Sequence, residues 1–106
     1  GLWMNTDIVK EQISDVLKTV YDPEIPVNIY EMGLIYEIDI QQDGMVNIKM
    51  TLTSPNCPAA QSLPAEVETK VKAIDEVLDA SIEIVWEPAW HIDMMTEDAK
   101  LELGID

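Results

Sequence analysis

The fold is decided by the stretch LIYEIDIQQDGMVNIKMTL, residues 34–52, in which two runs of alternating apolar and polar residues flank a turn. This period of two predicts two strands, each with one apolar face. Asp43-Gly44 between the runs predicts a hairpin with a tight primed turn, because such turns need positive φ. On the first strand the alternation assigns Ile35 to the polar face, and to the apolar face Leu34, Tyr36, Ile38 and Ile40.

Helical periodicity appears on both sides of this hairpin. Residues 5–20 predict a helix with Thr6 or Asp7 as its N-cap. A second helix is expected to carry its apolar face to Leu78; it either begins near Ala59 and kinks, or begins at Pro64. Ile82 to Trp86 predict a third strand, and residues 96–103 predict a final helix with a Thr96 cap.

The predicted order is therefore helix, strand, strand, helix, strand, helix. We expect a small two-layer α+β domain, in which helices cover one face of a three-stranded mixed sheet. A chain of 106 residues suits one domain. Residues 1–4 are expected to be an expression remnant and the start of the chain, and residues 5–106 the single domain.

The charge balance limits the classes of partner that we expect. The chain has 21 acidic and 6 basic residues and a formal net charge of −15. Nucleic acid and anionic membranes are therefore not expected as partners, since both bind clustered Lys and Arg. The acidic surface either promotes solubility alone or steers a basic protein or a metal cation toward the chain. One free thiol and no export signal lead us to expect the cytoplasm.

Cys57, the only cysteine, lies between two prolines just before the second predicted helix. A lone cysteine is most often a small buried hydrophobic residue. At a helix N-terminus, however, the positive end of the helix favours the thiolate, which attacks electrophiles and binds metals. One thiol cannot by itself complete a four-thiolate metal or cluster site. Other ligand types, a second copy or a partner protein would have to complete it.

Four further groups of residues are candidates. Acidic residues in the loop after the first helix are either solvated or able to ligate a metal or bind a basic partner; they are Asp22, Glu24 and Glu31. Thr51 and Thr53 either satisfy local backbone groups or line the same pocket as Cys57. Trp90 either packs in the core or belongs to an aromatic recognition patch. His91 could activate Cys57 only within hydrogen-bond reach, and the sequence shows no sign of that.

Three motifs together carry a family resemblance. Residues 22–36, DPEIPVNIYEMGLIY, residues 51–58, TLTSPNCP, and residues 86–90, WEPAW, with Leu103-Gly104, resemble the SufT/PaaD-like family of metal–sulfur cluster assembly factors. The resemblance covers the chain from residue 5 onward and implies an auxiliary, non-enzymatic role in iron–sulfur cluster assembly or transfer.

The resemblance also implies roles for individual residues. Cys57 becomes the ligand of iron or of a transient iron–sulfur cluster, and the pocket or partner-binding residues become Asp22, Glu24, Glu31, Thr51, Thr53 and Trp90. The implied partners are the iron–sulfur assembly machinery and client apoproteins, with a homodimer as one source of further ligands. Two alternatives stay open, namely a small cysteine-dependent thiol transferase or hydrolase, and a non-catalytic interaction module.

Overall fold

The computed structural model describes residues 5–21, 26–53 and 59–104. Its elements follow the predicted order, with one short 3₁₀ helix added before the last helix. They are α1 (Thr6–Leu17), β1 (Ile35–Ile40), β2 (Met45–Met50), α2 (Ala59–Lys72), β3 (Asp79–Ile84), η1 (Ile92–Met94) and α3 (Glu97–Glu102).

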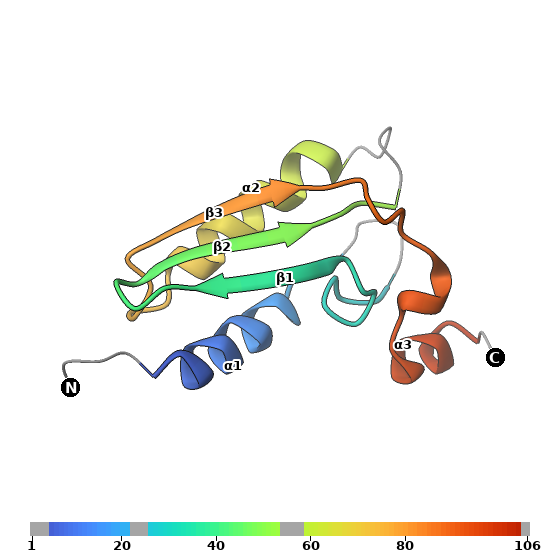
Figure 1. Ribbon diagram of the computed structural model, residues 1–106. Coiled ribbons are helices and arrows are strands. Elements are labelled where there is room, and N and C mark those ends of the chain that lie inside the picture. Colours follow the sequence, from blue (N-terminus) through green and yellow to red (C-terminus); the bar gives the residue numbers. More distant parts are fainter. Residues whose placement is uncertain (1–4, 22–25, 54–58, 105–106) are drawn as a thin grey trace.

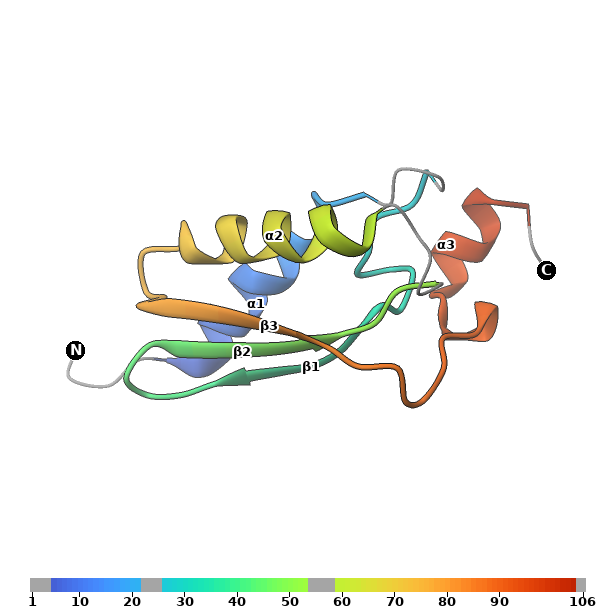
Figure 2. The ribbon, with the colours of Figure 1, turned by 90° about the horizontal axis from the view of Figure 1, so that it is seen from above.

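The sheet is mixed and three-stranded, as predicted. β2 lies in the centre, antiparallel to β1 and parallel to β3 (Figure 1). Figure 2 shows α1 and α2 on the same side of the sheet, with α3 beyond the end of the strands. α1 packs against β1 and α2 against β3, so the predicted two-layer α+β fold is confirmed.

The hairpin between β1 and β2 is present, but its turn differs from the predicted one. The Gln41 amide donates to the Met45 carbonyl at 2.9 Å and the Gly44 amide to the Gln41 carbonyl at 3.0 Å. This pattern, with φ of +92° at Gly44, is that of a three-residue loop closed by a glycine bulge. The prediction of a tight primed turn was wrong because Asp43 keeps a negative φ and only Gly44 is left-handed.

A β-bulge corrects the predicted faces of β1. The register shifts between Ile35 and Glu37, so that Ile35 pairs with Met50 and Glu37 with Lys49. Since Met50 faces the core, Ile35 packs there too, and the extra residue, Tyr36, leaves the apolar row. Strict alternation therefore misplaced both side chains, because a bulge inserts one residue that the period of two does not contain.

Both long helices are shorter than predicted. The N-cap of α1 is Asn5, whose Oδ1 accepts the amides of Asp7 and Ile8 at 3.1 and 3.3 Å, and not Thr6 or Asp7. α2 begins at Ala59 and contains Pro64 in its interior, the first of the two alternatives. It ends at Lys72, and Leu78 is 74% exposed in the turn before β3. That turn places Leu78 beside Gly44, so Leu78 contacts the hairpin loop and does not continue the apolar face of α2.

One core joins the sheet to the two long helices. Its fully buried members include Ile13 and Leu17 of α1, Val67 and Val71 of α2, and Ile48 of β2. Burial of such side chains contributes about 1.5–3 kcal/mol each, which holds the two layers together. Within the described residues, no helix is both long and apolar enough to cross a bilayer.

Candidate functional site

The candidate site lies at the end of the sheet where β2 finishes and α2 begins. β2 continues as an extended segment through Thr51 to Thr53, and α2 starts at the same end with Ala59 (Figure 1). The Thr51 amide donates to the Leu34 carbonyl at 2.8 Å, which ties this exit to the entry of β1. Cys57, Asp22 and Glu24 lie outside the described residues; the described residues nearest to Cys57, Thr53 and Ala59, are at this end.

Gly33 allows the C-terminal segment to approach this end closely. Its φ is +80°, and a Cβ built on it would lie 2.3 Å from the Met94 carbonyl oxygen. Any side chain at residue 33 would thus collide with the backbone of η1 in addition to straining φ. A second contact holds the same two segments, because the Trp90 indole Nε1 donates to the Met32 carbonyl at 2.8 Å.

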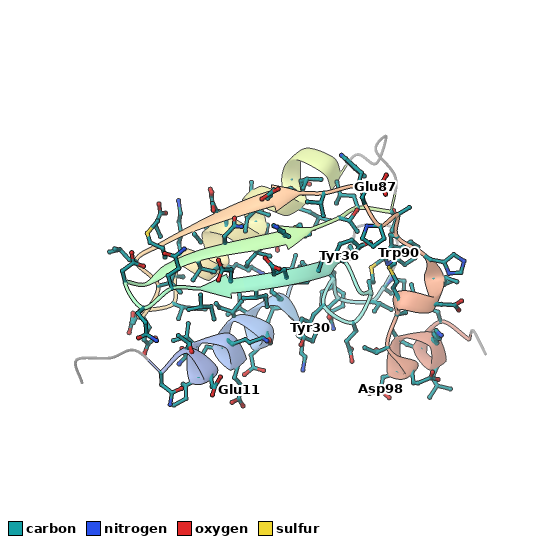
Figure 3. All side chains as sticks on the ribbon, in the orientation of Figure 1. Glu11, Tyr30, Tyr36, Glu87, Trp90 and Asp98 are labelled. Carbon is teal, nitrogen blue, oxygen red and sulfur yellow. The ribbon has the colours of Figure 1, made fainter. Side chains whose placement is uncertain are left out.

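Tyr36, displaced by the bulge, links three segments. Its hydroxyl donates to the Pro88 carbonyl at 2.7 Å and lies 3.5 Å from the Met94 Sδ. Burial raises the pKa of Tyr36, and the neighbouring Thr51 hydroxyl acts in the opposite direction. Figure 3 shows Tyr36 and Trp90 converging from β1 and from the segment after β3. The phenol therefore stays neutral around pH 7 and acts as a donor between strand and C-terminal segment.

Glu31 is held beside the C-terminal segment by its neighbours. Its amide donates to the Asn28 Oδ1 at 2.9 Å, and its Oε2 accepts the Asn28 Nδ2 at 3.2 Å. The Glu31 carbonyl accepts the amide of Thr96, the N-cap of α3, at 2.9 Å. A hollow of about 110 Å³ opens here, lined by residues that include Glu31, Asp98 and Glu102.

The other predicted site residues have clear structural surroundings. Thr51 is buried, with 1% of its surface exposed, and Thr53 is half-buried two residues further on. Trp90 is partly buried against the core. Exposed His91 caps η1, since its Nδ1 accepts the Asp93 amide at 3.2 Å. Roles of Thr51, Thr53, Glu31 and Trp90 in binding a partner stay predictions.

The described residues alone do not form a metal site. No group of three or more His, Asp or Glu side chains among residues 5–21, 26–53 and 59–104 is arranged to hold a metal ion. A metal or cluster ligand set at this end would thus need ligands from outside the described residues, such as Cys57, Asp22 or Glu24, or from a partner.

Sequence reasoning missed two residues that build this end. The sequence places Gly33 only in the first motif, and no local pattern there indicates that the distant Met94 backbone approaches it. Tyr36 was assigned to the core by the period of two, and no local signal marks the bulge.

The comparisons with known proteins agree with this picture. Residues 10–84 match the model of the iron-sulfur cluster assembly protein family, and the chain belongs to that family. A Porphyromonas gingivalis protein named Fe-S protein maturation auxiliary factor is 50% identical over 103 residues, which cover 95% of this chain and 98% of that protein.

Two further matches are a named relative and a solved structure. The Staphylococcus aureus Fe-S protein maturation auxiliary factor SufT is 38% identical over 86 residues, covering 81% of this chain and 98% of SufT. The crystal structure of a domain of unknown function from Bacillus anthracis superimposes with a TM-score of 0.88 at 31% identity, covering 94% and 95% of the two chains. The predicted resemblance to SufT-like assembly factors is confirmed.

Proposed function

We propose that this protein is an auxiliary factor that helps to assemble iron–sulfur clusters or to transfer them to client proteins. Family membership supports this role, as do the names of relatives that match nearly end to end. The cluster or iron is cargo in this scheme, and the partners are cluster-assembly proteins and client apoproteins. The reducing cytoplasm, where thiols persist, is the expected compartment.

The observation that carries the proposal is the convergence of all three sequence motifs at one end of the sheet. The first motif supplies Gly33 and Met32, which contact Met94 and Trp90 of the C-terminal segment. The second motif begins with Thr51, whose amide is bound by Leu34. Tyr36 and Pro88 are 52 positions apart in the chain, and Met32 and Trp90 are 58 apart. Both pairs meet at the end of the sheet where Thr51 leaves β2.

Cys57 is the proposed cargo ligand. It precedes the first residue of the 14-residue helix α2 by two positions. A helix of this length presents a positive dipole end that favours the thiolate. Because one thiolate cannot complete a cluster, a client, an assembly protein or a second copy of this chain supplies the remaining ligands. Asp22, Glu24 and Glu31 are proposed to bind basic residues of that partner.

Anaerobic reconstitution tests this role. The protein is incubated with iron and sulfide, alone and with an apoprotein client such as a ferredoxin, and cluster formation is followed by absorbance while size-exclusion chromatography reports complexes. We expect wild type to speed cluster acquisition by the client and Cys57→Ala to lose that effect. Ser81→Ala on β3 removes only an exposed hydrogen bond to the Asn47 Oδ1; it is the matched control and should transfer clusters as wild type does. Equal activity of wild type and Cys57→Ala would overturn the role of the thiol.

A further inference from the structure

The outer edge of β1 is an open strand edge beside a groove. β1 pairs only with β2 among the described residues, so its other side carries unpaired backbone groups. A groove of about 460 Å³ runs along this side, lined by Lys10, Tyr30, Ile35, Tyr36, Glu37 and Ile38. Figure 3 shows Tyr30 between α1 and β1, where the groove opens.

The ladder defines which backbone groups of β1 are free. The Gln41 amide donates to Met45, and backbone direction alternates along an antiparallel strand. Asp39 and Glu37 therefore point their amides and carbonyls toward β2. Ile38 and Ile40 direct theirs to the outer edge. The bulge ends before Glu37, so the edge from residue 37 to residue 40 is regular and able to pair.

Two of the common devices that protect an edge, lysine and proline, are missing from β1. Its sequence, residues 35–40, contains neither Lys nor Pro, and within the described chain no helix or loop pairs with its edge. The groove beside it combines apolar and aromatic residues with the charged residues Lys10 and Glu37. The Lys18 Nζ lies over the Tyr30 ring, 5.3 Å from the ring centroid. An added strand could place alternate side chains into this groove.

The charges beside this edge favour one kind of strand. Glu37 and Asp39 project to the face of the sheet opposite the helices, where Glu37 meets Lys49 at 3.8 Å and Asp39 lies across from Asn47. A second copy pairing antiparallel about Ile38 would set Glu37 opposite Asp39 twice, which repels. A strand with Lys or Arg at alternate positions would meet both carboxylates, and the net charge of −15 would attract it from a distance.

We propose that the outer edge of β1 binds an extended segment of a partner protein in which basic and apolar residues alternate. The segment adds a fourth strand next to β1, its basic residues face Glu37 and Asp39, and its apolar residues enter the groove beside Tyr30 and Ile35. Backbone hydrogen bonds to Ile38 and Ile40 hold the added strand in place. The carboxylates on one face of the sheet and the groove on the other select the sequence of the partner segment. This surface is independent of Cys57 and extends beyond the proposed cargo role.

The test uses a synthetic peptide of alternating lysine and valine, followed by amide NMR without iron or sulfide. We expect the peptide to shift the Ile38 and Ile40 amides and to slow their hydrogen exchange by about tenfold. A peptide with glutamate in place of lysine, and a lysine peptide N-methylated on its pairing side, should not bind. Because no cargo is present, failure here leaves the proposed cargo role untouched.

Two charge variants separate edge pairing from general attraction. Asp39→Lys on β1 should weaken peptide binding by about fivefold. Glu83→Lys on β3 makes the same charge change on the same face but at the other edge of the sheet, and should change binding far less. Equal weakening by both variants, shifts confined to β3, or no binding at millimolar peptide would overturn the proposal. So would Ile38 and Ile40 amides that are already protected in a free dimer.

Discussion

Gly33→Ala is expected to be the most damaging single-methyl addition among the described glycines. Two costs combine at this residue. A left-handed φ costs an alanine about 1–2 kcal/mol, and forcing a methyl group into a packed contact costs about 1–3 kcal/mol more. The new Cβ would lie 2.3 Å from the Met94 carbonyl oxygen, so the backbone of η1 has to move. We therefore expect a loss of about 2–5 kcal/mol in the free energy of unfolding.

Urea denaturation followed by tryptophan fluorescence measures this loss. The matched control is Gly104→Ala, which has a similar φ of +75° but no atom within 4 Å of the added Cβ. It isolates the backbone cost, so it should lose no more than about 1–2 kcal/mol. If Gly33→Ala were no less stable than Gly104→Ala, the close packing of η1 against the first motif would be refuted.

Three further variants test other parts of the structure. Tyr36→Phe removes the donor to Pro88 and should lower the free energy of unfolding by about 1 kcal/mol near neutral pH. Because the pKa of Tyr36 is raised in the folded protein, the contribution of its hydroxyl to stability is full below about pH 10 and is lost as pH rises through the folded pKa. A cost of the substitution that grows with alkaline pH would contradict this reasoning. Asn5→Ala removes the cap of α1 and should lower unfolding free energy by about 1 kcal/mol in thermal melts, whereas Asn5→Asp keeps the acceptor and should melt as wild type. Ile48→Ala empties a fully buried position and should cost about 2–5 kcal/mol in urea, against about 0.5 or less for the exposed Met45→Ala, and comparable losses would argue against the core as described.

The sequence predicted the elements that depend on local periodicity. The two strands around Asp43-Gly44 and the Thr96 cap follow from short-range patterns, and all are present. The errors arose where tertiary contacts override a local pattern. The bulge at Tyr36 accompanies a hydrogen bond from its hydroxyl to Pro88, which is 52 residues away.

Site residues were harder to predict than elements. Gly33 and Tyr36 act through segments that lie more than fifty residues further along the chain, and single-sequence patterns do not report such pairs. Trp90 shows the same limit. Its indole donates a hydrogen bond to the Met32 carbonyl, 58 residues away, whereas the sequence predicts only core packing or an aromatic recognition patch for Trp90.

The contacts of Pro88 and Trp90 with the first half of the chain have a consequence for biosynthesis. A ribosome releases the N-terminal helix and the hairpin long before residues 88–96. These later residues contact Tyr36, Met32 and Gly33 at the end of the sheet where β2 finishes. A nascent chain can therefore assemble much of its sheet before these contacts with the C-terminal segment form. A prematurely terminated product would therefore lack the contacts that hold the C-terminal segment against Met32, Gly33 and Tyr36.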